Sequence, residues 1–163
     1  MKINIIISPN FSKKKRIKKK IKFIIIHYTG MQSERECIER LTSNKSQVSA
    51  HYLISKSGNV IKIVDEANTA WHAGKSKWKN FINLNEQSIG IELVNKGHQF
   101  GYESFSKKQI SQLILLCKTL IRKYKIKKKK YSWPFRHCSS KKKGSRRKIS
   151  LAFFIKKKNW VLA

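Results

Sequence analysis

The chain has 163 residues, of which 40% are hydrophobic and 10% aromatic, so it can bury the core of one domain. Its formal net charge is +30, yet all eight acidic residues lie between Glu34 and Glu103, so that both ends carry only basic charges. This composition excludes a low-complexity chain, and the lack of any run of about 18 apolar residues predicts no membrane span.

The first 22 residues are expected to form a basic N-terminal arm. Residues 13–22 are a lysine-rich run, which is typical of a solvated, exposed segment. The apolar stretch at residues 3–7 is too short for a secretory signal, and no small-residue cleavage site follows it. We therefore expect a cytoplasmic protein, and we expect a monomer.

Residues 23–28 read as a buried strand that ends in a histidine. Four large apolar residues, three of them isoleucine, precede His27, and Gly30 ends the pattern. A histidine at the end of a buried strand is held rigidly toward whatever cleft lies beyond the sheet. On this segment alone, a structural histidine is the favoured interpretation, because a metal site needs further ligands.

The next elements alternate between helix and strand patterns. They are a helix over about 33–43 that opens with a capping box, a β-hairpin of residues 48–54 and 60–64, a strand at 88–95, and a long helix over about 106–125 with a second capping box. Glu92 is unusual because it lies inside the apolar run of the strand at 88–95. A buried carboxylate is costly unless it is paired or used in chemistry, so Glu92 is either a structural ion-pair partner or a functional group.

Four short motifs together resemble a known family. They are I-H-Y-T-G at 26–30, S-A-H-Y-L-I at 49–54, A-W-H-A-G at 70–74 and S-I-G-I-E at 88–92. In this order they resemble the zinc-dependent N-acetylmuramoyl-L-alanine amidases, a family that includes AmpD-type and AmiD-type bacterial enzymes, phage amidases and the peptidoglycan recognition proteins. The resemblance covers about residues 8–126. It implies an α/β fold with a mixed central β-sheet flanked by helices, and one catalytic zinc in a surface groove.

The resemblance also implies an activity and a set of site residues. The family hydrolyses the amide between N-acetylmuramic acid and L-alanine in peptidoglycan or muropeptides. His27 would be a zinc ligand, Glu92 the general base, and Trp71 and His72 would line the substrate groove, whereas His51 is expected to be structural. The chemistry is consistent, because zinc lowers the pKa of its bound water to about 7 and a neighbouring carboxylate can take up the proton.

Two further zinc ligands are missing from the expected place. The family supplies them near the C-terminus in a pattern like GHSDIAPxRKxDPG, whereas no acidic residue follows Glu103 here and His137 is the last histidine. A catalytic zinc needs three protein ligands. The site is therefore expected to be incomplete in this chain, and its activity is in doubt.

A shifted reading frame accounts for the missing pattern. Permitted codons for residues 131–139, read one base later, encode I-A-G-H-S-D-I-A-P, and permitted codons for residues 144–151 encode D-P-G-E-K-F-P-W in the same frame. We therefore expect three parts, which are the arm at 1–22, an amidase-like domain at 23–130, and an irregular basic tail at 131–163 that is the product of a frameshift.

Two other classes of function are open on sequence grounds. One is a non-catalytic peptidoglycan-binding module that keeps the groove without the chemistry. The other is a nucleic-acid binder, suggested by the charge of +30. Because the basic residues form runs without interleaved stacking aromatics, the charge predicts only non-specific binding of polyanions.

Overall fold

The computed structural model describes residues 1–126 and 150–151 of the chain. Its elements in chain order are β1 (Ile3–Ile5), β2 (Phe11–Ser12), η1 (Lys18–Lys20), β3 (Phe23–Tyr28), α1 (Glu34–Thr42), η2 (Asn44–Ser46), β4 (Tyr52–Ile54), β5 (Val60–Lys62), β6 (Thr69–Ala70), β7 (Lys77–Trp78), β8 (Phe81–Ile82), α2 (Leu84–Gln87), β9 (Ser88–Leu93), η3 (His98–Phe100), α3 (Lys107–Tyr124) and β10 (Ser150–Leu151).

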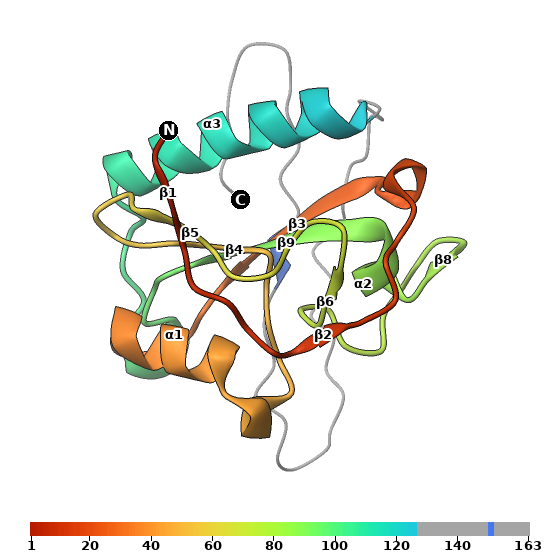
Figure 1. The fold of residues 1–163 in the computed structure, drawn as a ribbon. Coiled ribbons are helices and arrows are strands. Elements are labelled where there is room, and N and C mark those ends of the chain that lie inside the picture. The colour runs from red at the N-terminus through yellow and green to blue at the C-terminus, as the bar shows by residue number, and fades with distance from the viewer. Residues whose placement is uncertain (127–149, 152–163) are drawn as a thin grey trace.

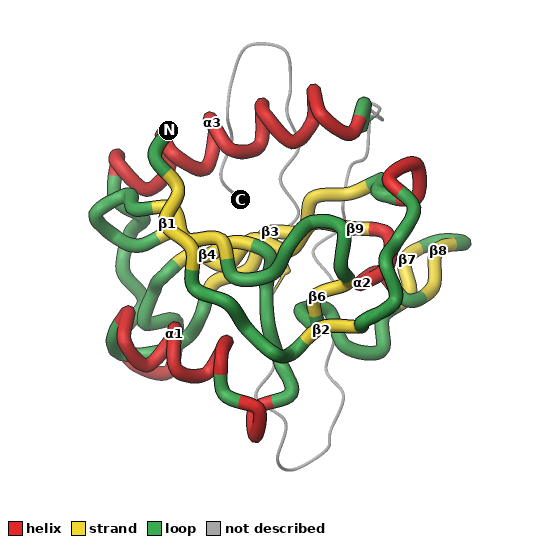
Figure 2. Tube along the Cα trace, viewed as in Figure 1, coloured by secondary structure: helices red, strands yellow, loops and turns green. Residues whose placement is uncertain are grey.

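A mixed six-stranded sheet forms the centre of the molecule, in the order β1-β5-β4-β9-β3-β10. The pairs β3–β9, β4–β9 and β1–β5 are parallel, whereas β4–β5 and β10–β3 are antiparallel. Helices α1 and α3 lie on opposite sides of this sheet (Figures 1 and 2). The expected α/β fold with a mixed sheet and flanking helices is confirmed.

Alternation along the central strands divides the core between the two helices. Ile26 and Ile91 belong to the cluster that packs under α3, whereas Leu53 packs with Cys37 and Leu41 of α1. Side chains of register partners point to the same face of a sheet. Because Leu53 and His27 are both register partners of Glu92, the candidate catalytic residues lie on the α1 face.

Both long helices begin at the serines that the capping boxes predict. Ser33 accepts a hydrogen bond from Glu36 N–H at the start of α1, and Ser106 accepts one from Gln109 N–H at the start of α3, each at 3.1 Å. The side chain of Gln109, however, does not complete the second box. It is buried and donates to the carbonyls of Ile54 and Val94, so it joins α3 to the ends of two strands.

The N-terminal segment differs from the expected separate arm. β1 pairs with β5 at the edge of the main sheet, and β2 pairs with β6. Ser8 and Asn10 are buried, and the Asn10 amide donates to the carbonyls of Ser43 and Val48. The lysines between residues 13 and 22 are exposed as expected. A run of lysines predicts only that the side chains are exposed to solvent. It carries no information on the backbone pairing of the residues before it, which form β1 and β2.

The C-terminal tail, expected at 131–163, lies outside the described residues except for β10. This short strand pairs with β3, with Ser150 opposite His27 and Leu151 opposite Ile26. The sequence pattern predicts no strand there, because backbone pairing at an open sheet edge needs no alternation of side chains. Among the residues that the structure describes, no helix is long and apolar enough to cross a membrane.

Candidate active site

His27 and Glu92 occupy matching positions on adjacent strands. β3 and β9 run in parallel, and the register places His27 opposite Glu92 near the carboxyl ends of both strands. The carboxyl end of a parallel sheet is the usual place for a ligand site. The His27 side chain is 2% exposed and that of Glu92 is fully buried. The structure therefore brings together the two residues that the resemblance implies as zinc ligand and general base.

His72 joins this pair from a loop far away in the sequence. Its Nδ1 lies 3.0 Å from Nε2 of His27, and the two rings meet edge to face with centroids 5.2 Å apart. On its other side, Nε2 of His72 lies 3.1 Å from Oγ of Ser88, the first residue of β9. Three buried side chains thus form a continuous hydrogen-bonded chain from Ser88 through His72 to His27.

The backbone of the loop that carries His72 is held by hydrogen bonds to two side chains, those of Asn85 and Ser49. Oδ1 of Asn85 accepts from the N–H groups of His72 and Ala73, at 3.1 and 2.8 Å. Trp71 N–H donates to Ser49 Oγ at 2.9 Å. The loop therefore presents His72 to the sheet in one orientation. The indole of Trp71 is half-buried and donates to Ser12 Oγ at 3.3 Å, which ties it to β2.

Gly90 provides the space for the His72 ring. A Cβ atom added at Gly90 would lie 2.4 Å from Cγ and 2.5 Å from Cδ2 of His72. Atoms at this separation overlap strongly, so any side chain at position 90 would displace the imidazole. The glycine in S-I-G-I-E is therefore required by the ring that packs on it, and the backbone there has no positive φ.

His51 has a structural role, as expected. The ring is fully buried, Nδ1 accepts from Gly90 N–H at 3.0 Å, and Nε2 lies 3.2 Å from the carbonyl oxygen of Asn68. Arg16 Nη2 lies 2.7 Å from the same Nε2. Burial, together with the positive charge of Arg16, lowers the pKa of His51 to about 3, so the ring is neutral at physiological pH.

Arg16 was missed by reasoning from the sequence, because it lies within a run of exposed lysines. Its guanidinium donates to the backbone carbonyls of Glu66, Asn85 and Ser88. Burial lowers its pKa to about 10, which leaves it charged at neutral pH. Because Asn85 and Ser88 both contact His72, Arg16 supports the loop and strand that hold His72.

Cys37 lies close to the site but is not a nucleophile. Its buried thiol donates to the carbonyl of Ser33 at 3.0 Å. Burial raises the pKa of Cys37 to about 11, and the nearby carboxylate of Glu92 acts in the same direction. The thiolate is the reactive form of cysteine, so the neutral thiol here is a packing group. Cys37 and Cys117 are both free and buried, as the sequence predicts.

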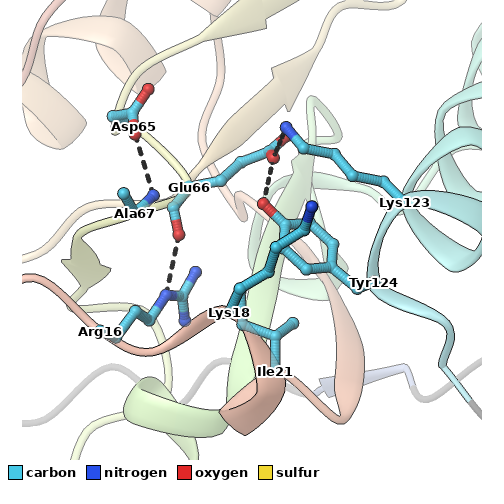
Figure 3. A pocket seen from close by; sticks show the side chains of 8 residues that line it. All are labelled: Arg16, Lys18, Ile21, Asp65, Glu66, Ala67, Lys123 and Tyr124. Carbon is cyan, nitrogen blue, oxygen red and sulfur yellow. Dashed lines mark hydrogen bonds and ion pairs between the residues drawn. The ribbon is translucent and has the colours of Figure 1, made fainter.

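A cavity that Arg16 also lines contains a structural polar cluster. It has a volume of about 240 Å³ and is lined by Arg16, Lys18, Ile21, Asp65, Glu66, Ala67, Lys123 and Tyr124 (Figure 3). The Glu66 carboxylate accepts hydrogen bonds from Tyr52, Lys123 and Tyr124. Burial opposes ionisation of Glu66, but these hydrogen bonds outweigh it and lower its pKa. The Glu66 carboxylate is satisfied by these three side chains, and the cluster joins the end of α3 to the sheet.

The residues present do not complete a metal site. Within residues 1–126 and 150–151, no group of three or more His, Cys, Asp or Glu side chains is placed to hold a metal ion. A catalytic zinc requires three protein ligands and an open position. His27 could supply one ligand, and the remaining ligands are not among the described residues. His137 and Cys138, whose side chains are of types that can bind zinc, lie outside the described residues.

Comparison with protein families identifies the fold. A family model described as N-acetylmuramoyl-L-alanine amidase matches residues 17–150, which is most of the chain. The chain belongs to this family. The match includes the strands that carry His27 and Glu92 and the loop that carries His72.

Individual members of the amidase family are similar over the same region. N-acetylmuramoyl-L-alanine amidase AmiD of Escherichia coli is 37% identical over 120 residues, which cover 66% of this chain and 42% of AmiD. The AmpD amidase of Salmonella typhimurium, named for 1,6-anhydro-N-acetylmuramyl-L-alanine, is 36% identical over 78 residues, covering 48% of this chain and 40% of AmpD. The chain thus spans less than half the length of these two relatives.

A solved structure of AmiD supports the same fold. The complex of E. coli AmiD with the substrate anhydro-N-acetylmuramic acid-L-Ala-D-γ-Glu-L-Lys superposes with a TM-score of 0.60 at 34% identity, covering 72% of this chain and 48% of AmiD. The mixed sheet with its flanking helices is therefore the amidase fold.

Proposed function

We propose that this chain carries the fold and part of the active site of an N-acetylmuramoyl-L-alanine amidase, which hydrolyses the amide between N-acetylmuramic acid and L-alanine. The observation that supports this most strongly is the placement of His27 opposite Glu92 on adjacent parallel strands. His72 lies within hydrogen-bond distance of His27. A muropeptide is the favoured substrate class, because the AmiD structure contains one.

Glu92 is proposed as the general base of the reaction. A carboxylate within hydrogen-bond reach of the attacking water takes up its proton as the tetrahedral intermediate forms. Complete burial removes Glu92 from bulk water, and its place opposite His27 directs it to the same face of the sheet. Trp71 and His72 are proposed to border the substrate groove, since their loop lies beside this pair.

Zinc is the proposed cofactor, with His27 as one ligand. The described residues do not supply the three protein ligands that a catalytic zinc requires. We propose that the other ligands are encoded by the shifted frame across codons 131–151. The nucleotide sequence of the gene tests this, because an unshifted frame that cannot encode G-H-S-D-I-A-P followed by D-P-G would refute the frameshift.

The activity is tested with two versions of the protein. One is the chain as given, and the other has the shifted frame restored from codon 131. Both are incubated with zinc and anhydro-N-acetylmuramic acid-L-Ala-D-γ-Glu-L-Lys, and release of the peptide is followed by mass spectrometry. We expect hydrolysis only by the restored protein. If the restored protein is folded, binds zinc and leaves the amide intact, the proposed activity is wrong.

A non-catalytic peptidoglycan-binding module is the second candidate. The observation in its favour is the lack of a three-ligand group within residues 1–126 and 150–151. Calorimetric titration of the chain as given with the same muropeptide distinguishes the two candidates. A binding module retains saturable affinity without zinc and gains no hydrolysis on frame restoration, whereas an amidase gains hydrolysis.

A further inference from the structure

We propose that the outer side of α3, together with β1, is a docking surface for an anionic lipid bilayer. The surface combines exposed basic and aliphatic side chains, and we call it the basic–aliphatic surface; its members are Lys2, Ile5, Lys108, Leu115, Lys118 and Arg122. The partner is recognised by two features together, which are negative charge at its surface and hydrocarbon beneath it. The inference does not depend on the proposed amidase activity.

The exposed side of α3 carries basic charge along its whole length. Residues spaced three or four apart share one side of a helix, and the exposed residues Lys108, Ser111, Leu115, Lys118 and Arg122 form such a stripe. No acidic residue occurs in α3. The helix has 18 residues, and at a rise of 1.5 Å per residue it is about 27 Å long. The stripe can therefore contact several lipid headgroups at once.

The charge of α3 contrasts with that of α1 on the opposite side of the sheet. α1 contains three glutamates and two arginines, whereas α3 contains five basic residues and no acidic one. Three acidic side chains at the border of the basic–aliphatic surface are already in ion pairs with lysines; the pairs are Asp65–Lys62, Glu66–Lys123 and Glu103–Lys56. Within the described part of the chain, the basic members of the surface are in no ion pair, so their charge is available to an external anion.

Exposed aliphatic side chains adjoin these charges. Leu115, at the centre of the stripe, is 41% exposed, and Ile5 is 70% exposed. Ile3 is the register partner of Val60, which belongs to the cluster under α3, so the alternation along β1 turns Ile3 and Ile5 to the α3 side of the sheet. Exposed apolar side chains that lie among polar ones are typical of a surface that contacts a partner or a membrane.

A cavity joins β1 to α3 (Figure 1). It has a volume of about 450 Å³, and Lys2, Lys107 and Lys108 line it together with the turn between β4 and β5. Ser57 and Asn59 of this turn add a hydroxyl and an amide. The start of β1 and the start of α3 therefore form one continuous surface, and its ammonium groups are suitable donors to lipid phosphates.

The aliphatic members favour a bilayer over a linear polyanion. A nucleic acid is bound through its phosphate charges and through base stacking, and it would leave Ile5 and Leu115 in water. An anionic bilayer attracts the basic side chains by its surface charge, while the aliphatic side chains enter the interface, and the two contributions strengthen each other. Because His27 and Glu92 lie on the α1 face, a protein docked in this way keeps its candidate active site on the side away from the lipid.

Binding of the full chain to vesicles tests the proposal without metal or muropeptide. The probe is a vesicle of equal parts phosphatidylglycerol and phosphatidylcholine, and a vesicle of phosphatidylcholine alone is the neutral reference. We expect sedimentation with the anionic vesicles and much weaker binding to the neutral ones. Failure of the unaltered chain to bind the anionic vesicles overturns the proposal. Because residues 127–163 are also rich in lysine, paired variants then decide which surface binds.

The first pair of variants locates the charge. Lys118→Gln/Arg122→Gln should weaken binding at low salt by about 25-fold, because each basic residue near an anionic surface contributes about fivefold. Arg35→Gln/Lys45→Gln is the matched control, since it removes one lysine and one arginine from exposed positions in α1 and η2. The control should change the affinity far less. Equal losses in the two double variants overturn the assignment to α3.

The second pair tests the aliphatic contact at constant charge. Leu115→Gln should weaken vesicle binding by about threefold or more, and the loss should persist at high salt, which screens charges but not apolar contact. Ile82→Gln is the control, because Ile82 is 61% exposed on β8, outside the basic–aliphatic surface. Unchanged vesicle binding by Leu115→Gln overturns the bilayer as partner. If Lys118→Gln/Arg122→Gln then also loses affinity for duplex DNA, the surface binds linear polyanions instead.

Discussion

Glu92 and His27 are register partners on two parallel strands, so the backbone pairing of β3 with β9 brings an imidazole and a carboxylate to the same face of the sheet. Neither side chain depends on a surface loop for its position. β9 is buried along its whole length, and Ile26 and His27 are the buried residues of β3. The pair is therefore a rigid part of the sheet, as a catalytic pair requires.

Replacement of Glu92 by Gln in the restored-frame protein should abolish proton transfer while keeping the shape of the side chain. We expect kcat to fall by about 10²-fold or more, which is typical for loss of a general base. Steady-state hydrolysis of the muropeptide measures this. Glu86→Gln is the control, because Glu86 is exposed on α2 and should leave kcat unchanged. Equal activity of both variants would remove Glu92 from the mechanism.

A side chain at position 90 should destabilise the protein through His72. Gly90→Ala forces the new Cβ into the imidazole, and overpacking of this kind costs about 1–3 kcal/mol. Urea denaturation measures the free energy of unfolding. Gly101→Ala introduces only the backbone strain of a φ of +81°, with no atom within 4 Å of the added Cβ, so it should leave the His72 NMR signals unchanged. If Gly90→Ala leaves both stability and the His72 NMR signals unchanged, the packing described here is wrong.

Acidification should destabilise the fold through His51. The unfolded chain binds a proton near pH 6.5, whereas the pKa of folded His51 is about 3. The unfolded state therefore holds more protons between these values, and stability is lost as pH falls through this window. From pH 7 to pH 5 we expect a loss of about 2 kcal/mol from this group.

Denaturant unfolding at the two pH values checks the effect of His51. A His51→Gln variant keeps a polar side chain that does not titrate, so its unfolding free energy should change less between pH 7 and pH 5. An identical pH dependence in both proteins would mean that His51 binds a proton in the folded state as readily as in the unfolded one.

Arg16 should matter more to stability than its place in a lysine-rich run indicates. Its guanidinium donates to three backbone carbonyls from two segments of the chain, and the single ammonium of lysine cannot reproduce this fork. We expect Arg16→Lys to cost about 2 kcal/mol of unfolding free energy. Arg35→Lys keeps the same chemistry at an exposed helical ion pair with Glu39 and should change stability by less than about 0.5 kcal/mol. Equal effects of the two would contradict the buried role of Arg16.

The sequence predicts the elements whose side chains have a clear period. The strand at 23–28, the capped helices and the hairpin all occur, although β4 begins only at Tyr52. The ladder is interrupted just before it, because the carbonyl of His51 accepts from both Ile63 and Val64 N–H. Such an irregularity depends on backbone geometry and leaves no trace in side-chain pattern.

Recognition of the site from sequence was limited to residues within motifs. His27, His72 and Glu92 lie in the motifs and are brought together by the fold. Ser88 also lies in one of the motifs, but its role depends on a contact with a loop residue, which no spacing reveals. Asn85 and Arg16 act through backbone groups of other segments, so their chemistry alone could not identify them.

Zinc content of the restored-frame protein tests the central claim most directly. After removal of metal and reconstitution, we predict about one tightly bound zinc per chain, lost in His27→Ala, and no tight binding by the chain as given. Loss of two of three ligands abolishes a site of this kind instead of weakening it. Tight zinc binding by the chain as given, or by folded restored-frame His27→Ala, would contradict the account.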